Sequence, residues 1–88
     1  MPSSKSGFVD SPTAPARKCF AVYPSDSNDL PVVTKAIYVG TAGDVSVRTI
    51  GSDSHVTFRN VPAGAILDIM AIAIRQSETT ASDIVGLA

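Results

Sequence analysis

The segment Gly40-Thr41-Ala42-Gly43 is the first candidate for chemistry, because a glycine-rich loop after a strand can bind phosphate through its backbone. Such a loop needs a Lys and a Ser or Thr after its second glycine, and then a helix whose N-terminus faces the anion. Here Asp44 follows the second glycine, and its carboxylate would repel phosphate. The residues after Asp44 alternate in the manner of a strand. We therefore predict a hairpin turn at residues 40–43, with the glycines supplying positive φ.

The chain has one cysteine and one histidine, Cys19 and His55. Cys19 lies in an apolar run, where a free cysteine behaves as a small hydrophobic residue. His55 begins a stretch that alternates like a surface strand, so we expect an exposed side chain. Two such residues cannot supply the four ligands of a zinc site, and one cysteine has no internal disulfide partner. The sequence therefore predicts no metal, no cofactor and no nucleophile with its base.

The eight carboxylates lie almost entirely in or beside turns, where Asp accepts backbone hydrogen bonds. Asp26 and Asp29 could be calcium ligands, but the glycine and closing glutamate of a calcium loop are absent, which favours turn chemistry. Asp68 is the exception, because it interrupts an apolar stretch. Two interpretations remain open for it, a buried carboxylate paired with an arginine or an exposed residue at a strand edge. No pair suggests acid–base catalysis, and we expect the protein not to be an enzyme.

The length and net charge of the chain limit the classes of partner that it can bind. Eighty-eight residues with a formal net charge of −1 make one domain and leave no basic patch for nucleic acid. The most apolar stretch, residues 66–74, is too short to span a bilayer, and the N-terminus has no apolar core of a secretion signal. We expect no nucleic-acid or membrane partner and synthesis in the cytoplasm. A chain this short builds a thin core, so oligomerisation is the expected source of extra stability.

Residues 1–16 are rich in Ser and Pro, and we interpret them as an extended N-terminal arm ahead of a domain at residues 17–88. Phe8 and Val9 are the apolar pair within this arm. The arm is either a disordered tail or a segment that docks on a partner with Phe8 as its anchor.

Strand and turn patterns fill the rest of the chain. Val45 and Val47 alternate with polar residues, as do Val56 and Phe58, which is typical of half-buried strands. Pro62 and Gly64 mark a turn. About six strands follow from these patterns, at residues 18–24, 32–39, 44–50, 55–61, 66–75 and 83–88. The prediction is an all-β fold, a small antiparallel β-sandwich or barrel of the jelly-roll kind.

The stretch at residues 66–75 is long enough for a helix, but its β-branched isoleucines and the strand signals before it favour a strand. Both of its faces are apolar from Ile69 to Ile74. Such a strand is central in a sheet or is covered by a neighbouring subunit. The second interpretation predicts an oligomer interface at Ile66, Ile69, Met70, Ile72 and Ile74.

Four blocks together, "DSNDLP", "AIYVGTAGDVSV", "VTFRNVPAGAIL" and "TTASDIVGL", resemble the head spike base proteins of tailed phages, prophages and gene transfer agents. The resemblance covers residues 17–88. It implies a structural protein of the virion or gene transfer agent particle, a pentamer on the five-fold capsid vertex that holds a spike fibre. The implied partners are the major capsid protein and the fibre protein, with Phe8 and Val9 docking on the capsid. The resemblance implies no catalytic residues, and it carries over only architecture to Gly40, Gly43, Asp44, Pro62, Gly64, Thr80 and Asp83.

A small carbohydrate-binding β-sandwich is the alternative. Sugar sites usually present flat aromatic rings, and this chain has no Trp. Its aromatic residues are Phe8, Phe20, Tyr23, Tyr38 and Phe58.

Overall fold

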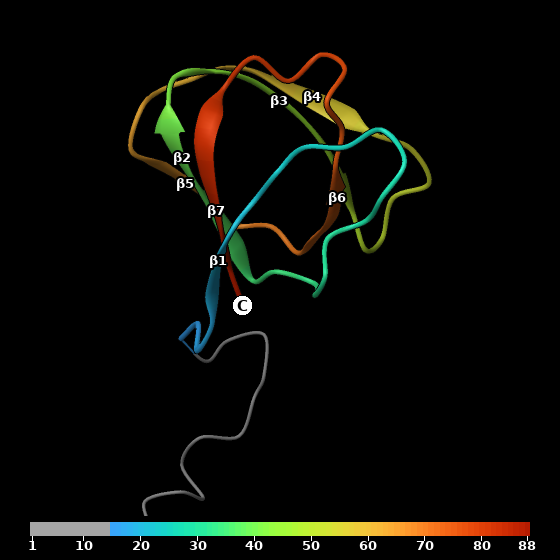
Figure 1. Ribbon diagram of the computed structural model, residues 1–88, viewed down its shortest axis with the longest axis vertical. Helices are drawn as coiled ribbons and strands as arrows, with labels where there is room; N and C mark the ends of the chain where they lie inside the picture. The colour runs from blue at the N-terminus through green and yellow to red at the C-terminus, as the bar shows by residue number, and fades with distance from the viewer. Residues whose placement is uncertain (1–14) are drawn as a thin grey trace, which may run out of the picture.

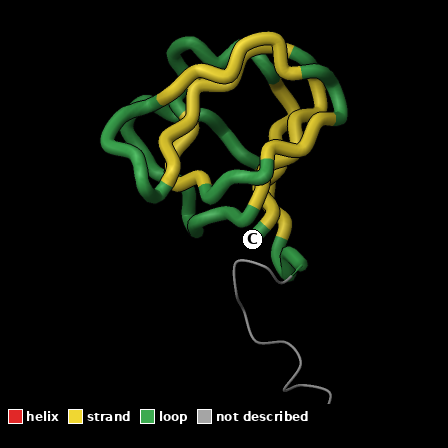
Figure 2. Tube along the Cα trace, turned by 180° about the vertical axis from the view of Figure 1, so that it is seen from behind, coloured by secondary structure: helices red, strands yellow, loops and turns green. Residues whose placement is uncertain are grey.

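The computed structural model describes residues 15–88, which form seven strands in two antiparallel sheets (Figure 1). The strands are β1 (Cys19–Ala21), β2 (Ala36–Thr41), β3 (Gly43–Thr49), β4 (Val56–Val61), β5 (Ala65–Leu67), β6 (Ala71–Ile74) and β7 (Ser82–Leu87). One sheet has the order β1-β7-β2-β5, and the other has the order β4-β3-β6. Strands and loops make up all of the described residues (Figure 2). The predicted all-β antiparallel fold is confirmed, with seven strands instead of about six.

Phe8, Val9 and most of the predicted arm at residues 1–16 lie outside the described residues.

The core lies between the two sheets and is built from alternate residues of their strands. Ile37 and Val39 of β2 are fully buried, and Val45 and Val47 of β3 face them from the other sheet. Ile84 of β7 completes the same cluster. Alternation of this kind places one side of each strand in the core and the other side outward.

The prediction of one strand at residues 66–75 is wrong. The segment forms two short strands, β5 and β6, which belong to different sheets. Between them the chain turns tightly, with the Ile69 N–H donating to the Leu67 carbonyl at 3.0 Å. Asp68 is exposed at this crossing, which selects the second of its two interpretations. The stretch looked apolar on both faces because its two halves pack on the core from two sheets.

The prediction of a hairpin turn at residues 40–43 is also wrong. β2 and β3 are separated only by Ala42 and lie in different sheets, so the chain passes from one sheet to the other without reversing. The glycines provide room instead. A Cβ on Gly40 would lie 2.7 Å from Asp83 Cβ, and one on Gly43 would lie 2.6 Å from the Ala81 nitrogen. Gly40 and Gly43 therefore let the chain at residues 80–83 approach closely.

Pro62 and Gly64 lie in a tight turn between β4 and β5. The Ala65 N–H donates to the Pro62 carbonyl at 3.2 Å, and Gly64 has a φ of 82°. A positive φ at the third position of a four-residue turn favours glycine. This turn also carries the chain from one sheet to the other.

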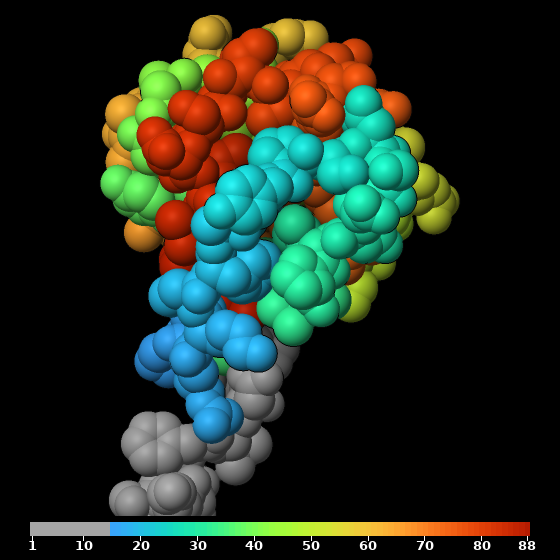
Figure 3. Space-filling view, in the orientation of Figure 1, coloured from blue at the N-terminus to red at the C-terminus, as the bar shows by residue number. Residues whose placement is uncertain are grey.

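The β1–β2 loop, residues 22–35, lies across the front of the molecule and covers the outer edge of β6 (Figure 3). The Ser25, Leu30 and Thr34 N–H groups donate to the carbonyls of Ile74, Ile72 and Ala71 at 2.9, 2.8 and 3.0 Å. A free strand edge invites pairing with another chain. Here the loop supplies the hydrogen bonds that a neighbouring strand would otherwise make.

Asp26 anchors this loop to residues 76–79. Its carboxylate accepts hydrogen bonds from the Ser77 N–H at 2.9 Å and the Ser77 hydroxyl at 2.8 Å. These two bonds, with a smaller contribution from Arg75, lower the pKa of Asp26 below its ordinary value. The charged form is therefore favoured in the folded state. Its stabilising effect is present above the ordinary carboxyl pKa of about 4 and is lost as the pH falls through the lowered value.

We expect Asp26→Asn to lower the melting temperature at pH 7 and to lower it less at pH 3. Thermal melts at pH 7, 5 and 3 measure the difference between the wild type and the variant. Asp68→Asn, at an exposed position, is the control and leaves the melting temperature nearly unchanged. A difference for Asp26→Asn that stays constant or grows on acidification contradicts the assignment.

Candidate functional site

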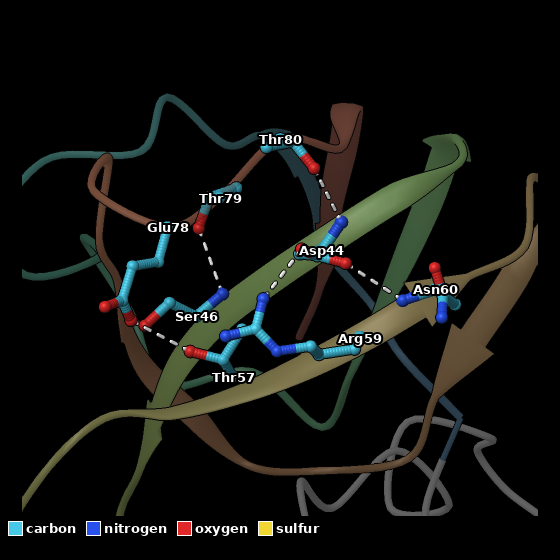
Figure 4. A network of polar contacts seen from close by, with 8 residues as sticks. All are labelled: Asp44, Ser46, Thr57, Arg59, Asn60, Glu78, Thr79 and Thr80. Carbon is cyan, nitrogen blue, oxygen red and sulfur yellow. Dashed lines mark hydrogen bonds and ion pairs between the residues drawn. The ribbon is translucent and has the colours of Figure 1, made fainter.

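Eight polar residues from β3, β4 and the β6–β7 connection form a network near the point where the chain passes from β2 to β3 (Figure 4). They are Asp44, Ser46, Thr57, Arg59, Asn60, Glu78, Thr79 and Thr80. Three of the sequence blocks singled out above, around residues 40–46, 57–64 and 79–83, meet here.

Threonine hydroxyls replace a partner strand along one edge of β3. The Thr80 hydroxyl accepts a hydrogen bond from the Asp44 N–H at 2.8 Å, and the Thr79 hydroxyl accepts one from the Ser46 N–H at 3.0 Å. In return, the Thr80 and Ala81 N–H groups donate to the Asp44 carbonyl at 2.9 and 3.1 Å. β6 ends at Ile74, so these contacts continue the pairing of β3 beyond it.

The Asp44 carboxylate joins β3 to the end of β4. It accepts hydrogen bonds from Arg59 Nη1 at 3.1 Å and from the Asn60 N–H at 3.0 Å. Asn60 has a φ of 56°, in the left-handed region that asparagine tolerates better than most residues. Every polar atom of Asp44 therefore holds neighbouring backbone or side chain, so its role is architectural.

Ser46 lies under this network, fully buried, and its Oγ has no hydrogen-bond partner in the described structure. Beside it, the Thr57 hydroxyl donates to Glu78 Oε1 at 3.0 Å. A serine nucleophile needs an adjacent base that takes its proton. Ser46 has no such base and no access to solvent, so it is not placed to act as a nucleophile.

His55 is half-buried in the loop before β4, so the prediction of an exposed strand residue is wrong. Burial lowers its pKa, and the charges of Arg75 and Arg48 lower it further. Its Nε2 is buried without a partner. Cys19 is exposed on β1, so the apolar residues beside it in the sequence do not place it in the core. Among residues 15–88, no group of three His, Cys, Asp or Glu side chains could hold a metal ion.

The five predicted interface residues fall into three environments. Ile66 is 61% exposed on β5. Ile69, Met70 and Ile72 are half-buried. Ile74 is 1% exposed and belongs to the core, so its side chain is not available to a neighbouring subunit.

Sequence reasoning missed the outer face of the four-stranded sheet. Ile66 pairs with Tyr38, Tyr38 pairs with Val85, and Val85 pairs with Ala21, so these residues form a row across all four strands. A second row lies two positions further along the strands and is formed by Cys19, Leu87 and Ala36. The sequence did contain a signal for this face. Apolar residues follow one another in β2 and β7, so both faces of these strands carry apolar side chains.

The described chain begins at the opposite end of this sheet from the Asp44 network. The Arg17 and Lys18 N–H groups donate to the Ala88 carbonyl at 2.6 and 2.8 Å, and Lys35 Nζ donates to the Pro15 carbonyl at 3.3 Å. The register places Leu87 beside Ala36 at this end and Ser82 beside Thr41 at the other. The first described residues therefore lie beside Ala88, at the end of the sheet that also holds Lys35.

A scan against protein-family models found no match, and a search of curated proteins found none either. A search of solved structures found a chain of a structure described as the capsid of a native gene transfer agent particle, computed with C5 symmetry. The two chains are 30% identical, the match covers 97% of this chain and 98% of that one, and the TM-score is 0.83. No helix within residues 15–88 is long and apolar enough to cross a membrane.

Proposed function

This chain belongs to the same family as that component of a gene transfer agent capsid, and we propose that it is the oligomeric base of a head spike on the capsid vertex. In this proposal it is a structural protein of the particle, and its role needs neither a substrate nor a cofactor. Its proposed partners are further copies of itself, the major capsid protein and a spike fibre.

One observation carries the proposal, the match over nearly the whole length of both chains at 30% identity. That degree of likeness in fold and sequence, over nearly the whole of both chains, favours the same place in the particle. The symmetry of the matched particle supports a ring of five copies. The polar network supports a structural role, because the hydrogen bonds of Asp44 and its threonine partners join neighbouring strands and loops.

The experiment is to delete the encoding gene from the host and compare purified particles. We expect mass spectrometry to find the chain in wild-type particles, and negative-stain images of the deletion to show capsids without spikes. Spikes that persist at normal occupancy on particles from the deletion strain contradict the proposal, as does a chain that never co-purifies with particles.

The N-terminal arm has its own part in the proposal, capsid attachment through Phe8 and Val9. Its point of attachment, beside Arg17, Lys18 and Lys35, is the end of the domain that would face the capsid. We expect a chain lacking residues 1–16 to keep its circular dichroism spectrum and to be lost from particles. Normal occupancy of the truncated chain contradicts this role, and Phe8→Ala tests it with a single side chain.

A further inference from the structure

We propose that the outer face of the four-stranded sheet, made by Cys19, Ala21, Ala36, Tyr38, Ile66, Val85 and Leu87, is the surface on which a second copy of this chain packs. The inference rests on the proposed function and deepens it, because it names the surface that joins one copy to the next.

The register places these seven side chains on one face. Ile37, Val39 and Ile84 point into the core, so their sequence neighbours Ala36, Tyr38 and Val85 point outward. Phe20 packs on the core, and its ring would lie 2.5 Å from a Cβ on Gly86, its partner on the inner side of β7. Cys19 and Ala21 therefore face outward on β1, and Ile66 does so on β5.

The face is apolar in its centre and charged only at its rims. None of its seven residues is charged. Asp83 lies at one end of β7, and Lys18 and Lys35 lie at the other end of the sheet. A centre depleted in charge and surrounded by a polar rim is typical of contacts between protein subunits, and of homo-oligomers above all.

The face covers the centre of a contact and not the whole of one. β2 and β7 have six residues each and β1 and β5 have three, so at about 4.8 Å per strand and about 3.3 Å per residue the face covers roughly 290 Å² in projection. A standard interface buries about 800 Å² on each partner. The face alone supplies about a third of that, so a contact of standard size would extend beyond the face onto its rims. An apolar patch of about this size is the largest that a typical monomer exposes, and such patches are often functional.

The direction of the face fits a second copy as its occupant, and the C5 symmetry of the matched particle supports a ring of copies. Its strands run from the end where residues 1–14 join the domain to the end that carries the Asp44 network. If the first end meets the capsid, the face lies along the side of the molecule, where the next copy in a ring stands. A ring contact is heterologous, so this face packs on a different surface of the neighbour.

The test measures the assembly of the purified full-length chain and of Tyr38→Lys by native mass spectrometry and light scattering over a range of micromolar concentrations. Ile66→Lys is a second variant at the other side of the same row. Val56→Lys is the matched control, because Val56 is 57% exposed on β4, which belongs to the other sheet. Both face variants replace exposed side chains, and circular dichroism verifies that they fold.

Cys19 supplies a readout that needs no substitution, since it is the one cysteine in the chain and lies on the face. We expect the wild type and Val56→Lys to assemble and to protect Cys19 from maleimide. Tyr38→Lys and Ile66→Lys should need at least about 100-fold higher concentration to assemble and should label rapidly. Face variants that assemble like the wild type, or a wild-type oligomer with fully reactive Cys19, overturn the inference. A wild type that stays monomeric also overturns it, whereas the proposed function fails separately, when the chain is absent from particles.

Discussion

Gly43→Ala will destabilise the fold by about 3 kcal/mol, enough to lower the melting temperature of a domain this size by roughly 15 °C. The new Cβ would lie 2.6 Å from the Ala81 nitrogen and 2.8 Å from the Thr80 carbonyl carbon. Both are backbone atoms, so no side chain can rotate away. The backbone at residues 80–81 must withdraw, and this withdrawal breaks three hydrogen bonds with Asp44. Each is worth about 1 kcal/mol.

Gly51→Ala is the matched control, because a Cβ at Gly51 meets no atom within 4 Å. We expect a change within about 0.5 kcal/mol, typical of surface positions. Urea unfolding followed by circular dichroism measures both variants. Equal stability of Gly43→Ala and Gly51→Ala contradicts the account in which Gly43 serves the close approach of residues 80–81.

Asp44→Ala will destabilise the fold by about 2 kcal/mol, because the Asn60 N–H and Arg59 lose a charged acceptor. Most of this effect comes from the Asn60 N–H, since Arg59 is 68% exposed and an exposed ion pair contributes little. We therefore expect Arg59→Ala to cost less than Asp44→Ala. Asp44→Asn keeps an oxygen acceptor and should recover part of the loss.

Asp53→Ala is the control for Asp44→Ala, since Asp53 is exposed in the loop between β3 and β4. Urea unfolding of the four variants ranks them. A ranking in which Arg59→Ala costs as much as Asp44→Ala would mean that the ion pair, and not the bond to the backbone, holds the end of β4.

Local alternation predicted the strands but not their partners. The strands β3 and β4 were predicted from the alternation of Val45 and Val47 and of Val56 and Phe58. These two strands do form the hairpin that short connections predict. The same reasoning placed a hairpin at Gly40 and Gly43, where the chain instead changes sheets. A glycine that makes room for a distant segment looks the same in the sequence as one that supplies a turn. The distinction depends on residues 80–83, some forty positions away.

The interface prediction shows a related limit. Apolar residues on both faces of residues 66–75 suggested a surface shared with a neighbour, and Ile66 is indeed exposed. The segment breaks at Asp68, however, and Ile74 joins the chain's own core. The apolar outer face comes from β1, β2, β5 and β7 together. It could not be assembled from the sequence without the order of strands in the sheet.

Cryo-electron microscopy of intact particles tests the central claim most directly, that this chain is a structural protein at the capsid vertex. The proposal predicts density on the five-fold axes into which five copies of the seven-stranded domain fit, and its loss in particles from a strain without the gene. Vertices that look the same in both strains, or density for this domain elsewhere in the particle, would contradict it.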